Sequence, residues 1–101
     1  MIDFGHYKNR LIKMTEPYPI YDREDDTKII GYTKIGDMAV ITYSMPTESY
    51  HEVVIVSGEY TGVDTLALDN NNLAKAVFII NKIDNYGHAY IRGKKVACEY
   101  V

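Results

Sequence analysis

Hydrophobic and polar residues alternate in short runs along this chain, most regularly between residues 18 and 68. Turn-forming segments around Gly31, Gly36 and Gly58 separate the runs. A period of two over four to eight residues, bounded by such turns, is typical of β-strands. The runs predict strands at residues 20–21, 28–32, 38–43, 50–56 and 59–63, with 57–58 as a hairpin turn. The pattern therefore predicts an all-β (mainly β) protein whose sheet bends strongly, as in a small barrel.

The alternation also assigns faces and connecting segments. In the strand at 38–43, Met38, Val40 and Thr42 are expected on one face, and Ala39, Ile41 and Tyr43 on the other. Residues 22–26 are too charged for a strand and predict an exposed loop. Residues 64–68 are interpreted as a single helical turn over the barrel mouth, and residues 69–72 as a turn or helix cap. Residues 11–14 fit an N-terminal strand or a docking turn.

The segment 73–83 supports two interpretations. Leu73, Val77, Ile80 and Ile83 recur at helical spacing behind an asparagine cap. The β-branched and aromatic residues of 77–80 favour a strand instead. We favour the strand and keep a short helix within 73–83 as the alternative. A turn is then expected at 84–87, followed by a C-terminal hairpin in which 88–91 pairs with a closing strand at 95–101.

Composition places the chain among folded domains, because 47% of its 101 residues are hydrophobic and 25% are charged. Its single cysteine, Cys98, cannot form an intrachain disulfide, which favours a reducing compartment. The first 15 residues lack the apolar run of a secretion signal, and no segment reaches the ~20 apolar residues of a membrane span. We therefore expect a cytoplasmic protein without a membrane partner.

Charge is distributed unevenly along the chain. Residues 16–72 carry three basic groups against eleven acidic ones, whereas residues 1–15 and 73–101 are each slightly basic. Nucleic-acid phosphates require concentrated lysine and arginine, so this acidic middle region argues against nucleic-acid binding. It suits a partner with a basic surface.

The sequence offers no convincing catalytic or metal site. Cys98 and His88 lack an evident orienting acid, and an inert buried thiol is the better interpretation. Glu48, His51 and Glu52 lie close in sequence, but neighbouring residues of a strand point to opposite faces, so His51 is expected at the surface. Asp25 and Asp26 lack the burial that a general acid–base pair needs. We therefore expect a protein that is not an enzyme, with no cofactor and no metal.

Residues 18–68 resemble the SH3-type barrel, in particular the bacterial SH3-like (SH3b) family. The resemblance rests on the strand and turn at 27–37, Thr27-Lys28-Ile29-Ile30-Gly31-Tyr32-Thr33-Lys34-Ile35-Gly36-Asp37, and on Gly58-Glu59-Tyr60-Thr61-Gly62-Val63. Tyr50-His51 replaces the tryptophan usual in that family. The resemblance implies one SH3-like domain spanning residues 1–101, with an N-terminal extension at 1–17 and a C-terminal β extension at 69–101. It also implies a peptide-binding groove beside the loop after the first strand.

These observations predict a protein-interaction module that binds a basic protein segment through an acidic and aromatic surface. The residues expected there are Tyr18, Tyr21, Asp22, Glu24, Asp25, Asp26, Tyr43 and Tyr50. An adaptor, assembly accessory or inhibitor of bacterial or phage origin would suit this chemistry. Two alternatives are a module that binds cell-wall peptides and a structural subunit that self-associates into a homo-oligomer by adding the strand at 95–101 to a neighbour's sheet.

Overall fold

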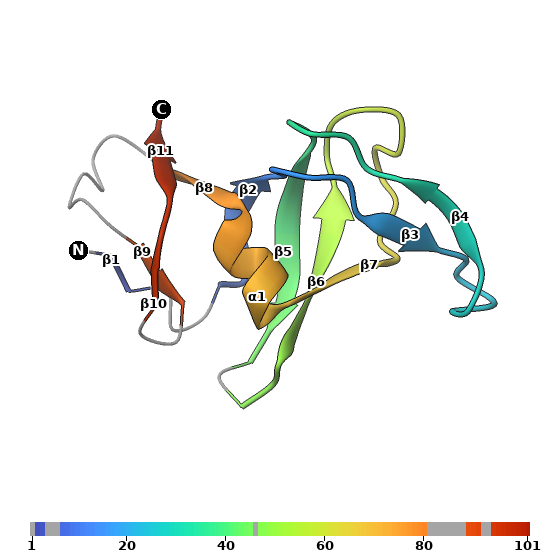
Figure 1. Cartoon of the computed structure of the whole chain (residues 1–101), viewed down its shortest axis with the longest axis horizontal. Helices are drawn as coiled ribbons and strands as arrows, with labels where there is room; N and C mark the ends of the chain where they lie inside the picture. The colour runs from blue at the N-terminus through green and yellow to red at the C-terminus, as the bar shows by residue number, and fades with distance from the viewer. Residues whose placement is uncertain (1, 4–6, 46, 81–88, 92–93) are drawn as a thin grey trace.

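Short strands and one short helix build the protein, shown in Figure 1 as a computed structural model. The structure describes residues 2–3, 7–45, 47–80, 89–91 and 94–101. The elements are β1 (Ile2–Asp3), β2 (Leu11–Lys13), β3 (Pro19–Tyr21), β4 (Ile29–Tyr32), β5 (Met38–Ser44), β6 (Tyr50–Ile55), β7 (Leu66–Asp69), α1 (Asn70–Lys75), β8 (Val77–Ile80), β9 (Ala89–Ile91), β10 (Lys94–Val96) and β11 (Cys98–Tyr100). The predicted mainly-β class is confirmed.

The largest sheet has six strands in the order β11-β8-β2-β5-β6-β7. β2 lies inside this sheet, antiparallel to both β5 and β8. The expected N-terminal extension therefore contributes an interior strand, and the expected C-terminal extension contributes β8 and β11. Strands from both ends of the chain thus belong to the same sheet as β5, β6 and β7.

The antiparallel ribbon of β3 and β4 stands apart from the main sheet and is not hydrogen-bonded into it. Its strand β3 lies against β7. Residues 22–26 form the predicted exposed loop at the outer end of the ribbon. Gly31 of β4 allows the ring of Tyr60 to approach closely, since a Cβ atom at residue 31 would lie 2.0 Å from the Tyr60 hydroxyl oxygen. The tight turn predicted at 35–37 is present, with Gly36 at a φ of +92°.

Side chains that alternate along β5, β6 and β7 form one side of the hydrophobic core. We call this side of the three strands the inner face and the opposite side the outer face. The core residues contributed by these strands are Ala39, Ile41, Val53, Ile55, Leu66 and Leu68. Ile12 from β2, Leu73 from α1 and Phe78 from β8 are among the other members of the same cluster.

The hairpin after β6 differs from the prediction. Residues 57–62 form turns instead of a strand, and the strand that pairs with β6 is β7. Gly58 and Gly62 both adopt positive φ, which L-amino acids with a side chain rarely do. The helical turn expected at 64–68 is also wrong, because Leu66 and Leu68 are buried while Ala67 is exposed, which is the alternation of a half-buried strand.

The ambiguous segment contains both predicted structures. The helix α1 begins behind Asp69, whose carboxylate accepts a hydrogen bond from the Asn72 backbone at 2.7 Å. The backbone becomes extended at Ala76, and β8 follows. The favoured strand is therefore confirmed for 77–80, and the alternative helix for 73–75. Residues 81–83 and the turn expected at 84–87 lie outside the described residues.

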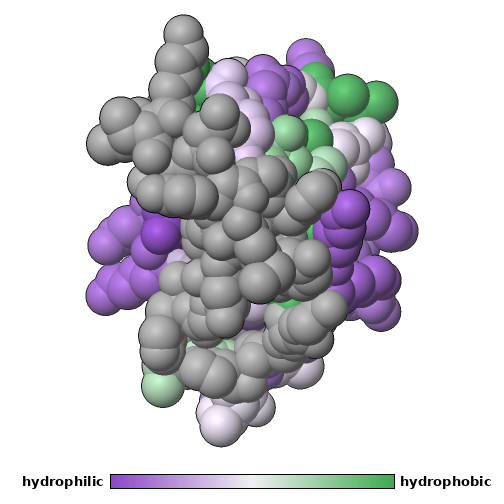
Figure 2. All heavy atoms as spheres, turned by 90° about the vertical axis from the view of Figure 1, so that its left-hand side faces the viewer, coloured by the Kyte–Doolittle hydropathy of each residue, from purple (hydrophilic) through white to green (hydrophobic). Residues whose placement is uncertain are grey.

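The C-terminal strand predicted at 95–101 is divided in two. β10 pairs with β9 as the expected antiparallel hairpin, whereas β11 pairs in parallel with β8. The backbone N–H of Phe78 donates to the carbonyl of Ala97, the residue between the two strands. Figure 2 views the end of the molecule that carries this hairpin, and the described residues at its left and right margins are mainly hydrophilic.

Candidate functional site

A groove of about 630 Å³ lies between the β3–β4 loop and the outer faces of β5, β6 and β7. Tyr21, Asp22, Arg23 and Asp26 from the loop region form one wall. The other wall and the floor come from Thr42, Glu52, Val54, Asp64, Thr65, Leu66 and Ala67. We call this feature the acidic groove. Segments far apart in sequence meet there because β3 packs against β7.

Hydrogen bonds within the loop fix its shape. The carboxylate of Asp22 accepts from the backbone N–H of Glu24 at 2.8 Å, and that of Asp25 accepts from both the N–H and the hydroxyl of Thr27. The backbone N–H of Asp22 donates to the carbonyl of Lys28 across the loop base at 2.8 Å. The hydrogen bond from the Thr27 hydroxyl to the Asp25 carboxylate is the main cause of the lowered pKa of Asp25. The groove wall is therefore held by local turns as well as by the β3–β4 pairing.

Negative charge dominates the groove. Its described lining residues include four carboxylates and one cation, Arg23. Arg23 forms an ion pair with Asp64, which joins the loop to the segment before β7. Asp22, Asp26 and Glu52 remain as carboxylates without a cation of the lining paired to them in the described part of the chain. The groove can accept cationic groups by direct charge complementarity.

A second, smaller hollow of about 280 Å³ adjoins the acidic groove and shares Tyr21, Arg23, Asp64 and Thr65 with it. It adds Ile30, Gly62 and Val63 to the lining, so its additional walls are apolar. Ile30 is nearly half exposed on β4. The two hollows together present an acidic surface beside an aliphatic one.

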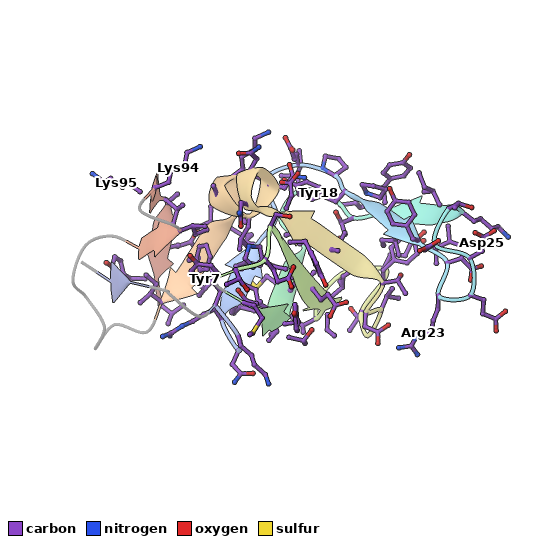
Figure 3. All side chains as sticks on the ribbon, turned by 90° about the horizontal axis from the view of Figure 1, so that it is seen from below. Tyr7, Tyr18, Arg23, Asp25, Lys94 and Lys95 are labelled. Carbon is purple, nitrogen blue, oxygen red and sulfur yellow. The ribbon has the colours of Figure 1, made fainter. Side chains whose placement is uncertain are left out.

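The structure separates the predicted site residues into groups. Tyr21, Asp22 and Asp26 line the acidic groove, whereas Glu24 and Asp25 are exposed on the same loop outside its lining. Tyr43 and Tyr50 stack on each other on the outer face, with ring centroids 5.8 Å apart. Figure 3 shows Arg23 and Asp25 at one end of the molecule and Lys94 and Lys95 at the other.

Tyr18, which was expected on the binding surface, is instead buried. Only 5% of it is exposed, and its backbone N–H donates to the hydroxyl of the buried Thr33. Figure 3 shows it beside the helix, consistent with a position near Asp69. Burial, helped by the neighbouring Glu16 and Asp69 carboxylates, raises the pKa of Tyr18 to about 12. Tyr18 belongs to the hydrophobic core cluster, between two prolines that each fix their own φ.

Sequence reasoning missed the contribution of the sheet to the groove. Glu52, Val54 and Thr42 were predicted as ordinary strand residues, and Asp64 as part of a helical turn. Their shared face depends on the pairing of β5 with β6 and of β6 with β7, which alternation within a single strand does not specify. The acidic character of the middle region was the only available indication.

His51 is fully buried, which contradicts its expected place at the surface. Its Nδ1 lies 2.8 Å from the Ser44 hydroxyl and its Nε2 lies 2.6 Å from the Asn70 side-chain oxygen. Its ring also meets the edge of Tyr7. A serine, a histidine and an amide are thus in contact, but both Ser44 and His51 are enclosed. This cluster connects β5, β6 and α1 and has no surface for a substrate.

Neither a metal site nor a reactive cysteine emerges from the part of the chain that the structure describes. No group of three or more histidine, cysteine, aspartate or glutamate side chains is placed there to hold a metal ion. Cys98 is half-buried, less enclosed than predicted, and its thiol donates weakly to the Val96 carbonyl at 3.8 Å. Within the same residues, no helix has the length and apolar character needed to cross a membrane.

No family model, curated protein or solved structure matches the chain.

Proposed function

We propose that this protein is a non-enzymatic interaction module that holds a basic segment of a partner protein in its acidic groove. The observation that carries the proposal is the convergence of Asp22, Asp26 and Glu52 around a groove whose single cation, among the described lining residues, is already paired. A lysine or arginine side chain entering there would meet carboxylates on both walls. The adjoining hollow beside Ile30 would take an aliphatic side chain of the same segment.

Charge also favours the proposal at long range. The acidic middle region forms the ribbon loop and the groove walls, so its field extends from the end of the molecule that carries Asp25. Complementary charge accelerates encounter with a basic partner and selects against acidic ones. An adaptor, assembly accessory or inhibitor would use such a surface.

We further propose that residues 11–80 form the SH3-type barrel that the turn pattern suggested for residues 18–68. Five strands follow the continuous order β8-β2-β5-β6-β7. Along the chain, the ribbon of β3 and β4 follows β2, and the short helix α1 precedes β8. This arrangement supports the resemblance, and the groove beside the inserted ribbon is where that resemblance implies peptide binding.

The groove can be tested by titrating the ¹⁵N-labelled protein with a short lysine- and arginine-rich peptide and with an acidic peptide of the same length. The basic peptide is expected to shift the amide resonances of residues 21–26, 52–54 and 64–67. Asp22→Asn with Asp26→Asn removes two groove charges while keeping the side-chain shapes. We expect binding on the order of tenfold weaker, from about 0.2–1 kcal/mol per exposed ion pair.

The matched control is Glu24→Gln with Glu59→Gln, which removes the same charge from exposed positions outside the groove lining. It should bind the basic peptide nearly as well as the natural protein. Equal weakening by the two double variants would show that net charge acts without the groove. The absence of any shift with the basic peptide would refute the proposed function.

The edge position of β11 supports self-association as a second candidate. β11 is the terminal strand of the six-stranded sheet, so one of its edges has no strand paired to it among the described residues. A second copy could extend the sheet there. A molar mass from light scattering that stays monomeric over a wide concentration range would eliminate this candidate.

A further inference from the structure

Two tyrosines form an exposed aromatic pair next to the acidic groove. The rings of Tyr43 on β5 and Tyr50 on β6 stack with an interplanar angle of 21°. Tyr50 is 40% exposed, and Tyr43 is half-buried. Stacked rings on an otherwise solvent-facing sheet surface offer a flat π surface to a ligand.

A bulge in β5 puts Tyr43 on the outer face. Strict alternation, which the sequence predicted, would put Tyr43 on the same face as Ile41, which is buried. The register with β6 shifts between Ile41 and Tyr43, so Ser44 takes the inward position beside His51. Tyr43 is thereby paired with Glu52, which lines the acidic groove. Bulges of this kind often redirect a side chain next to a functional site.

The aromatic pair is continuous with the groove. Tyr50 lies two residues before Glu52 on the same face of β6, about 7 Å along the strand. Thr42, the residue before Tyr43, also lines the groove. Burial and the neighbouring Glu48 carboxylate raise the pKa of Tyr43, with Tyr50 and Glu52 adding to the effect. Tyr43 is therefore a neutral phenol near neutral pH, and carboxylates lie beside it.

We propose that the Tyr43–Tyr50 pair binds an arginine side chain of the basic segment, with Glu52 as its carboxylate partner. This inference rests on the proposed function of the acidic groove and names the residue type that the groove selects. The guanidinium group is planar, stacks on aromatic faces and can bond a carboxylate through its edge at the same time. A lysine ammonium group is compact and strongly hydrated, so it gains less from a flat ring surface.

The test compares two short peptides that differ only in carrying arginine or lysine at the same alternating positions. The natural protein is expected to bind the arginine peptide about two- to fivefold more tightly, which corresponds to a cation–π contribution of about 0.5–1 kcal/mol. Tyr43→Leu with Tyr50→Leu should reduce that ratio to near one while leaving charge-driven binding of the lysine peptide. Tyr43→Phe with Tyr50→Phe keeps both ring faces and should keep the preference.

Tyr32→Leu provides a control, because Tyr32 is 54% exposed on β4 and lines neither hollow. It should retain the arginine preference. An unchanged arginine-to-lysine ratio in the double leucine variant overturns the proposal. An equal loss of the arginine preference in Tyr32→Leu and in the double leucine variant overturns it as well.

A second titration separates this proposal from the groove. N-acetyl-arginine amide, added at millimolar concentration, should shift the ring protons of Tyr43 and Tyr50 more than N-acetyl-lysine amide does. If the arginine amide shifts the ring protons more but neither peptide binds, the proposed function of the groove is refuted and the proposed aromatic site is retained. Equal ring shifts from the two amides would refute the aromatic site even if the peptides bind.

Discussion

The inner and outer faces of β5, β6 and β7 come from alternating residues of the same strands but are organised in opposite ways. His51 on the inner face is fully enclosed, and Ser44 and Asn70 satisfy both of its ring nitrogens. Its neighbour Glu52 on the outer face is exposed and lines an open groove. A buried polar group must be paired within the protein, whereas an exposed one remains available to a partner. One strand thus supplies both a structural histidine and a binding carboxylate.

The sharpest way to test this contrast is to truncate the two neighbours separately. His51→Ala should lower the free energy of unfolding by about 3 kcal/mol, because it leaves a cavity and removes the hydrogen bonds of His51 with Ser44 and Asn70. Glu52→Ala should change it by less than about 0.5 kcal/mol. Urea unfolding followed by circular dichroism measures both. Similar losses for the two variants would contradict the assignment of faces.

The interior position of Tyr18 predicts a loss of stability at high pH. Its pKa is raised to about 12 in the folded protein, against about 10 in the unfolded chain. The folded state therefore holds the phenolic proton more tightly. The resulting stabilisation is complete below pH 10 and is lost as the pH rises from 10 to 12, on the order of 2 kcal/mol.

The Tyr18→Phe variant should lack this part of the pH dependence. Chemical unfolding at a series of pH values, together with ultraviolet titration of the tyrosines, measures it. If the unfolding free energy falls with pH equally in the natural protein and in the variant, Tyr18 is not the group responsible.

The bulge in β5 permits a milder comparison between Thr42 and Ser44, two hydroxyl residues on either side of Tyr43. Ser44→Ala removes a buried hydrogen bond to His51 and should cost about 1–2 kcal/mol. Thr42→Ala affects an exposed hydroxyl whose bond to the Glu52 carbonyl is 3.3 Å long, and should cost less than about 0.5 kcal/mol. Thermal unfolding of both variants distinguishes them. A larger loss at Thr42 would indicate that the register shift lies elsewhere.

The smallest effect is expected for Glu52→Gln. It keeps the shape of the side chain and should leave the unfolding free energy within about 0.5 kcal/mol of the natural protein. Calorimetric titration with the arginine peptide should nevertheless show weaker binding. If Glu52→Gln changed the unfolding free energy but not the affinity for the arginine peptide, the roles that we assign to the two faces would be wrong.

Local sequence patterns predicted the elements whose boundaries depend on local chemistry. The alternation in 50–56 and the turn at Gly36 were sufficient for β6 and for the start of β5. The charged loop at 22–26 was also predicted, since five consecutive charged residues cannot be buried in a strand. Three of the residues that line the groove, Tyr21, Asp22 and Asp26, followed from it.

The sequence could not predict features that depend on pairing between distant strands. The bulge at residues 41–43 separates Tyr43 from the face of Ile41 that alternation predicted for it, and only the partner strand β6 defines that bulge. His51 was assigned to the surface because its partners, Ser44 and Asn70, belong to other elements. Tyr18 was assigned to the site because an aromatic residue near an acidic loop has the same local pattern whether it faces the core or solvent.

The central position of β2 has a consequence for how the chain reaches its native state. Leu11 is paired with Val40 on one side and with Ile79 on the other. Both contacts close long loops, and contacts of that kind slow the folding of small domains. During synthesis, the segment around Leu11 emerges before residue 79 and cannot acquire its second neighbour until that residue has been added. Residues 11–13 are therefore expected to be among the last to gain protection from hydrogen exchange as the protein folds.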